Sequence, residues 1–406
     1  MPDSTARSRA LTGLPSPDDV MALLRGVVDP ELGSDIVELG MAKGAEVAPD
    51  GAVTVTIALT TSGCPLRAQL QRDVRARIGS LPGVTGVQLR WTELTADEKS
   101  AAMAKARWNV REKAPTTAVP PTTRVLTIAS GKGGVGKSSV TVNLAAALAA
   151  KGFAVGVLDA DIWGFSIPRM LGLEGRLQGA TTGERKIAPQ IKPMGRGRLE
   201  VVSMGLLVED EAEALMWRGL MLNRAVQHFL EDVAWGDLDY LLIDMPPGTG
   251  DVQMGLARML PRAEMIIVTT PAVSAQKVAI RAATMARKSY VRIVGVVENM
   301  SSFRCDHGDE YALFGEGGGD ALARDAGVPL LAQIPIESSV AAGGDAGEPV
   351  ALGSGPAAQA FVDLATLLVE EAAPPVSMAG CSARMLDAAV AALDALDAAA
   401  SAPVES

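Results

Sequence analysis

The chain has 406 residues, of which 48% are hydrophobic and 21% charged, and its formal net charge is -10 at pH 7. This length allows two or three domains with a large buried core, and the composition is that of a globular protein. The negative charge opposes non-specific binding to nucleic acid phosphates or to anionic lipid. We therefore expect neither nucleic acid nor a membrane among the partners.

The cysteines and the apolar segments indicate the cellular compartment of the chain. Cys64, Cys305 and Cys381 are far apart and odd in number, which argues against a disulfide framework and favours a reducing compartment. The N-terminal segment lacks the apolar core of a signal peptide, and no apolar run approaches the ~18 residues that span a bilayer. These features predict a cytoplasmic protein.

Residues 17–95 are predicted to form a small α+β domain. Their patterns predict a helix, an alternating strand, a second helix and a short strand over residues 20–27, 52–59, 66–78 and 84–91. In the second helix apolar residues recur at four-residue spacing, so we expect one face to be buried: Leu66, Leu70, Val74 and Ile78.

The rest of the chain divides into three further parts. Residues 96–123 end in a Pro/Thr cluster that we expect to stay extended, which predicts a linker. Over residues 124–371, apolar runs such as VLTIA and YLLID alternate with helical segments, as is typical of an α/β domain with a doubly wound, mostly parallel sheet. Residues 372–406 form an acidic, Ala-rich tail with one predicted helix.

The segment GKGGVGKS, from Gly131 to Ser138, matches the phosphate-binding pattern G-x-x-x-x-G-K-S/T between an apolar strand and an apolar helix. Its glycines let successive N–H groups turn toward one anion, and the helix N-terminus adds its positive end. Lys137 is expected to reach the β- and γ-phosphates, and the Ser138 hydroxyl to ligate Mg²⁺. A glycine-rich turn that binds nothing is the alternative, which this strand–loop–helix context disfavours. The predicted nucleotide-binding residues of the loop are Gly131, Lys132, Gly133, Gly134, Val135, Gly136, Lys137, Ser138 and Ser139.

Acidic residues follow two further apolar runs, at strand ends where open α/β sheets bind ligands. Asp244 ends LLID and is placed to hold Mg²⁺, and the MPPGTG segment after it predicts a loop that senses the γ-phosphate. Asp159 and Asp161 end VLDAD, where a carboxylate can orient the attacking water. The alternative for each aspartate is a helix N-cap or a turn.

These motifs together resemble the Mrp/ApbC family of iron-sulfur cluster carriers, P-loop ATPases with a deviant Walker A lysine. The similarity over residues 124–368 rests on GKGGVGKS, LDADIWGFSIPRMLG, MWRG, LLIDMPPGTGD, GVVENMS, FGEGGG and GGDAGEPV. The segments DPEL and TTSGCPLR look like the small metal-sulfur cluster assembly domain that is often fused in front of this ATPase.

The resemblance implies roles for matching residues. Lys132 would cross to the phosphates of a partner subunit, so the ATP-bound form would be a homodimer. Lys132 and Lys137 would join Asp161, which orients water, and Asp244, on the Mg²⁺ side, as catalytic residues. Asn299 would read the adenine edge, with a turn residue as the alternative. ATP hydrolysis would release a [4Fe-4S] cluster to apo iron-sulfur proteins, with cluster scaffold proteins as further partners.

One segment departs from the family pattern. Members usually carry C-x-x-C after N-M-S, whereas this chain has Gly308 in the position of the second cysteine. Cys305 and His307 from each of two subunits would offer a Cys₂His₂ set, a mixture that certain Fe-S and zinc sites accept. The alternative is a loop cysteine beside a surface histidine, without metal.

Other interpretations remain open at this point. Cys64 precedes a predicted helix whose dipole favours a reactive thiolate, and a small buried cap residue is the alternative. A MinD- or ParA-type positioning switch, or a non-metal adaptor, would use the same nucleotide loop. The MinD-type role is disfavoured because the tail is acidic, through Asp387, Asp394 and Asp397, and would be repelled by anionic lipid. The ParA-type role needs a cationic face for phosphates, which the net charge does not favour.

Overall fold

The structure of the chain is a computed structural model. It describes residues 13–29, 32, 34–60, 67–111, 117–161, 164–179, 187–206, 219–248, 251–289, 291–305, 307 and 309–376. Cys64, Cys381 and the predicted tail helix lie outside the described residues.

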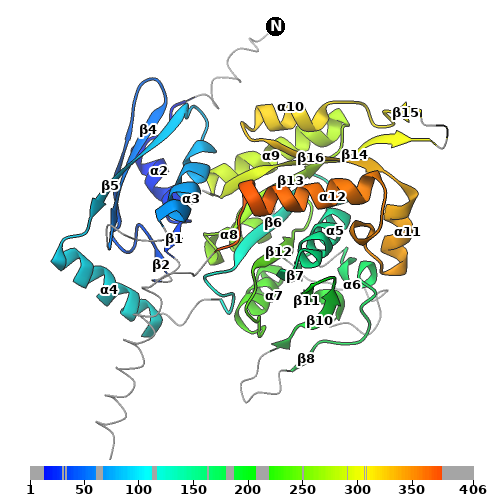
Figure 1. Cartoon of the computed structure of the whole chain (residues 1–406), viewed down its shortest axis with the longest axis horizontal. Helices are drawn as coiled ribbons and strands as arrows, with labels where there is room; N and C mark the ends of the chain where they lie inside the picture. The colour runs from blue at the N-terminus through cyan, green and yellow to red at the C-terminus, as the bar shows by residue number, and fades with distance from the viewer. Residues whose placement is uncertain are drawn as a thin grey trace, which may run out of the picture.

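A mostly parallel sheet forms the centre of the larger domain (Figure 1). Its strands are β6 (Arg124–Ser130), β7 (Ala154–Asp159), β10 (Gln190–Met194), β11 (Gly197–Ser203), β12 (Tyr240–Asp244), β13 (Glu264–Thr269), β14 (Arg292–Arg304), β15 (Glu310–Tyr311) and β16 (Leu330–Ile336). The order is β10-β11-β7-β12-β6-β13-β14-β15, and β16 also pairs with β14. Within the described ranges only the β10–β11 and β14–β15 pairs of this sheet are antiparallel. The predicted fold class is confirmed.

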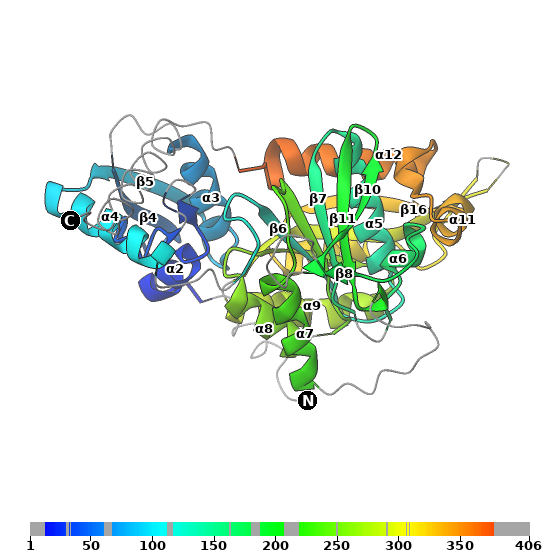
Figure 2. The same ribbon diagram turned by 90° about the horizontal axis from the view of Figure 1, so that it is seen from below.

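Helices cover both faces of this sheet, because its strands are apolar on both sides (Figure 2). One face carries α5 (Lys137–Ala150), α6 (Ile167–Met170), α11 (Ser338–Ala346) and α12 (Pro356–Leu367). The other carries α7 (Gly219–Glu231), α8 (Asp251–Met259), α9 (Val273–Lys288) and α10 (Gly318–Asp325). Short 3-10 turns at Met204–Leu206 and Val350–Leu352, a π turn at Leu368–Ala372 and the strand pair β8 (Gln178–Gly179) and β9 (Ile187–Ala188) complete the domain.

The smaller domain packs a three-stranded sheet against helices. Its elements are α2 (Pro17–Leu24), β1 (Val28–Asp29), β2 (Ser34–Asp35), β3 (Ala42–Val47), β4 (Ala52–Leu59), α3 (Arg67–Gly79), β5 (Gly86–Glu93) and α4 (Ala96–Arg111). Strand β4 has the predicted bounds, and β3, whose sequence AKGAEV is weakly alternating, was not predicted. Leu70, Val74 and Ile78 of α3 are buried as expected, and Leu66 lies outside the described residues.

Part of the segment predicted as a linker is helical. Residues 96–111 form α4, and Ala102 and Ala106 are buried in the core of the small domain. The prediction missed a capping box, in which Thr95 and Glu98 exchange hydrogen bonds between side chains and backbone N–H groups at 2.9 and 3.3 Å. Residues 117–123 are not helical, and Val119 is buried in the larger domain. The domain boundaries themselves stay a prediction. None of the described helices is long and apolar enough to cross a bilayer.

Candidate nucleotide-binding site

The glycine-rich loop joins the carboxyl end of β6 to the N-terminus of α5. Gly134 and Gly136 have φ values of 80° and 81°, which side chains other than glycine rarely adopt. A Cβ on Gly131 would lie 2.3 Å from the backbone nitrogen of Ala279, so only glycine lets the loop pack on α9. Gly136 is the N-cap of α5 and offers no side-chain cap. The loop therefore leaves a helix N-terminus of the kind that binds phosphate.

Asp244 joins the loop to the end of the neighbouring strand β12. Its fully buried carboxylate lies 2.8 Å from Nζ of Lys137. The Ser138 hydroxyl donates to the same carboxylate at 2.6 Å, and the Thr141 hydroxyl donates to its other oxygen at 2.8 Å. The structure thus brings together the three predicted residues Lys137, Ser138 and Asp244.

Two further carboxylates lie at the end of β7. Asp161 is 3.7 Å from Nζ of Lys137. Asp159 accepts a hydrogen bond from the Ser203 hydroxyl at 3.0 Å. Burial, and next the negative charge of Asp244, raise the pKa of Asp159 to about 7. Burial also raises the pKa of Asp161, against the opposing charge of Lys137. The negative charge of the carboxylates at the carboxyl ends of β7 and β12 therefore exceeds the positive charge of Lys137.

Sequence reasoning missed Thr141 and Ser203. Thr141 lies one helical turn after Lys137, so its side chain points to the same carboxylate. That spacing could have identified it. Ser203 ends β11, a strand that the apolar runs did not indicate, and only the parallel pairing of Ser203 with Asp159 brings the two together.

Lys132, within the loop, and Asn299, on β14, each contact a neighbouring element. Nζ of Lys132 is 3.3 Å from the Ser274 hydroxyl at the start of α9. The buried Asn299 amide donates to the Val135 carbonyl at 2.9 Å, so it supports the loop from β14. Met300 follows with φ of 58°, an uncommon value for a residue with a side chain. Their predicted contacts with a partner and with adenine stay predictions.

Cys305 and His307 lie between β14 and β15. The Cys305 thiol is free and half-buried, and the Cys305 N–H donates to the Asp309 carbonyl at 2.9 Å. His307 is exposed, and its neighbours Asp306 and Gly308 lie outside the described residues. In the described part of one chain, no three His, Cys, Asp or Glu side chains are grouped as metal ligands. The predicted set takes two ligands from each of two copies, so a single copy supplies only Cys305 and His307.

A glycine loop with a buried lysine, beside carboxylates at the ends of adjoining parallel strands, defines a P-loop NTPase. Residues 122–369 match the family described as NUBPL iron-transfer P-loop NTPase, and residues 17–89 match the iron-sulfur cluster assembly protein family. The chain belongs to the NUBPL iron-transfer family, which confirms the kinship expected from its motifs.

Named relatives agree with this assignment. The iron-sulfur cluster carrier protein of Mycobacterium leprae is 45% identical over 340 residues, which are 82% of this chain and 87% of the relative. The protein of the same name from Synechocystis sp. is 40% identical over 367 residues, 89% of this chain and 98% of the relative. A solved nucleotide-binding protein of Archaeoglobus fulgidus, in complex with ADP, is 37% identical over 55% of this chain and 86% of its own, with a TM-score of 0.47.

Proposed function

We propose that this chain is an ATPase that carries iron-sulfur clusters and releases them to apoproteins. The observation that carries the ATPase part is the contact of Lys137 and Ser138 with Asp244 at the carboxyl ends of β6 and β12. Membership of the iron-transfer family supports an iron-sulfur cluster as the cargo. The nucleotide proposed is ATP.

The residues present fit Mg²⁺ as the cation of the nucleotide. The Ser138 hydroxyl and the Asp244 carboxylate are the oxygen donors that Mg²⁺ prefers, and they already lie 2.6 Å apart. The raised pKa values of Asp159 and Asp161 indicate negative charge that a cation would relieve. When bound, Mg²⁺ would neutralise charge on the phosphates. Lys137 would then bind the phosphates, and Asp161 would orient the attacking water.

The active form proposed is a homodimer. Within the described ranges the Nζ of Lys132 donates to an uncharged and exposed partner, the Ser274 hydroxyl, so it can leave at little cost. In a partner's site its charge would stabilise the γ-phosphate in the transition state, as an arginine finger does. Asn299, held against Val135, is proposed to read the adenine edge.

The cargo proposed is a [4Fe-4S] cluster, held between two subunits by Cys305 and His307 of each. Thiolate with imidazole is a known ligand mixture for clusters. The recipients proposed are apo iron-sulfur proteins, and cluster scaffold proteins are the proposed donors. Location in the cytoplasm stays a prediction from the cysteine usage.

Calorimetry with Mg·ATP tests the ATPase proposal. We expect the parent and Lys151→Ala, at the far end of α5, to bind alike. The variant with both Lys132→Ala and Lys137→Ala should lose at least ~100-fold in affinity, because two charges at the phosphates are removed. Equal affinity of the double variant and the parent would end this proposal.

Iron and acid-labile sulfide after anaerobic reconstitution test the cargo. Cys305→Ala and His307→Ala should each lose most of the cluster, whereas Cys381→Ala should keep it. If Cys305→Ala holds as much iron and sulfide as the parent, the proposed ligand set is wrong. A parent that binds Mg·ATP but no cluster would favour the non-metal adaptor, which Gly308 at the family's second cysteine position already supports.

A further inference from the structure

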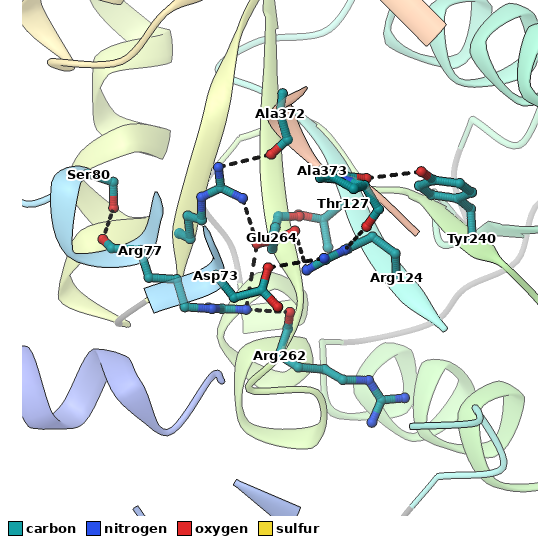
Figure 3. A network of polar contacts seen from close by, with 12 residues as sticks. Asp73, Arg77, Ser80, Arg124, Thr127, Tyr240, Arg262, Glu264, Ala372 and Ala373 are labelled. Atoms are coloured by element: carbon teal, nitrogen blue, oxygen red, sulfur yellow. Dashed lines mark hydrogen bonds and ion pairs between the residues drawn. The ribbon is translucent and has the colours of Figure 1, made fainter. Parts of the chain in front are cut away.

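A second group of buried charges lies at the opposite edge of the sheet, at the amino ends of its strands (Figure 3). Glu264 begins β13 and is fully buried. Its carboxylate lies 2.8 Å from Arg292, which begins β14, and 3.5 Å from Arg124, which begins β6. Because a parallel strand rises ~3.3 Å per residue, this group is ~20 Å from the glycine-rich loop at the other end of β6.

The small domain contributes two residues of α3 to this group. Arg77 is 2% exposed, and its Nη2 donates to the Arg262 carbonyl at 2.8 Å and lies 3.8 Å from the Glu264 carboxylate. One turn earlier, the Asp73 carboxylate accepts from Arg124 at 3.1 Å. Two ion pairs of opposite polarity thus cross between the domains. Such an arrangement specifies one relative position (register) of α3 on the sheet, because shifting the small domain would place like charges next to each other.

The backbones of the two domains also approach closely here. A Cβ on Gly26, which follows α2, would lie 2.3 Å from Nη1 of Arg77 and 2.9 Å from the Pro261 carbonyl. The segment after α12 closes the other side, where Arg292 donates to the Ala372 carbonyl at 3.0 Å and Arg124 to the Pro374 carbonyl at 2.9 Å. The contact is therefore built from three separate parts of the chain.

We propose that the amino-end edge of the ATPase sheet is a docking surface for the cluster assembly domain of the same chain, and that Arg77 and Asp73 determine its register. The small domain is then held as one unit with the ATPase domain instead of moving on an extended linker. Docking removes Arg77 from water, which is costly for a charge, and the opposing Glu264 and the Arg262 carbonyl offset part of that cost. The domain contact does not depend on whether a cluster is carried.

Hydrogen exchange on the full-length chain tests the docking. Arg77→Met keeps the apolar stem and removes the charge, and Arg75→Met, an exposed arginine of the same helix, is the matched control. We expect Arg77→Met to raise exchange by at least ~10-fold both in α3 and in residues 260–264, and to increase the radius of gyration in small-angle scattering. Arg75→Met should behave as the parent.

A second variant distinguishes loss of docking from a folding defect. Gly26→Val leaves every charge in place and inserts a side chain between Arg77 and Pro261, so it should produce the same paired change in exchange. Parent-like exchange on both sides of the contact in Arg77→Met and Gly26→Val would overturn the proposal. A rise confined to α3, with residues 260–264 unchanged, would also overturn it, because Arg77 would then stabilise only its own domain.

Discussion

The carboxyl edge and the amino edge of the central sheet both bury charged side chains, but the pKa values of their buried carboxylates shift in opposite directions. At the carboxyl edge three aspartates surround Lys137, and burial together with Asp244 raises the pKa of Asp159 to about 7. At the amino edge burial would raise the pKa of Glu264, yet Arg292, Arg124 and Arg77 lower it to about 2.

This difference distinguishes a ligand-binding site, at the carboxyl edge, from a structural contact between domains, at the amino edge. Negative charge at the carboxyl edge is left partly uncompensated, so a cation brought with a ligand finds a favourable place there. At the amino edge the arginines are paired with Glu264 and Asp73 and with backbone carbonyls, such as those of Arg262 and Pro374. Buried charge alone does not identify a functional site, whereas the direction of the pKa shift helps to do so.

Removing Glu264 should have the largest effect. Glu264→Gln removes the buried carboxylate that Arg77, Arg124 and Arg292 share, so the free energy of unfolding should fall by about 3–5 kcal/mol. Urea unfolding at pH 7 measures this loss. Glu200→Gln is a matched control, because its partner Arg198 is partly exposed. If Glu264→Gln lowers the free energy of unfolding by less than ~1 kcal/mol, the charges at the amino edge do not form a stabilising domain contact.

Lys137 should matter for turnover at the other edge. Lys137→Met removes the charge that contacts Asp244 and Asp161, so steady-state ATP hydrolysis should fall at least ~100-fold. Arg77→Met, at the amino edge, should retain hydrolysis within about twofold, since it lies ~20 Å away. If both variants lose hydrolysis equally, the two edges do not work independently.

The sequence predicts these two edges unequally. Gly131 to Ser138, Asp159 and Asp244 were predicted because a phosphate loop has fixed spacing and because carboxylates after apolar runs share one edge of a parallel sheet. The amino-edge group was not predicted. Arg77 and Glu264 are 187 positions apart in sequence, and a charged residue before an apolar run looks like a solvated strand start.

The small domain illustrates the same limit. Local patterns predicted β4 and α3 because alternation and four-residue spacing are properties of short segments. The docking of α3 on the ATPase domain depends on which surfaces meet, and no periodicity encodes that. Residues 96–123 were predicted as a linker from the Pro/Thr cluster at their end, and helix α4, which begins at the capping box of Thr95 and Glu98, was not predicted.

The two edges should respond to pH with opposite sign. The folded-state pKa of Asp159 is raised to about 7, so the folded chain binds more protons than the unfolded chain, and stability is lost as pH rises from ~4 through 7. The folded-state pKa of Glu264 is lowered to about 2, so its contribution is present above ~4.5 and is lost as pH falls toward 2.

Asp159→Asn isolates the carboxyl edge in this comparison. The variant cannot ionise, so its stability advantage over the parent should be larger at pH 8 than at pH 5 by about 2 kcal/mol, because the parent loses stability as pH rises toward 7. Urea unfolding at both pH values measures the difference. Asp239→Asn, at the amino end of β12, serves as a control carboxylate. A constant difference between parent and Asp159→Asn across this range would show that Asp159 does not titrate there.

Two buried threonines give the smallest and most closely matched comparison. The Thr141 hydroxyl donates to the Asp244 carboxylate, and the Thr127 hydroxyl donates to the backbone carbonyl of Glu264 at 3.1 Å. Each change to valine removes one buried hydrogen bond, so each should lower the free energy of unfolding by about 1 kcal/mol. Only Thr141→Val alters the carboxylate that faces the nucleotide, so only this variant should weaken Mg·ATP binding, by a few-fold in calorimetry. Equal Mg·ATP affinities for the two variants would mean that Thr141 supports the fold of the carboxyl edge but does not orient Asp244 for the ligand.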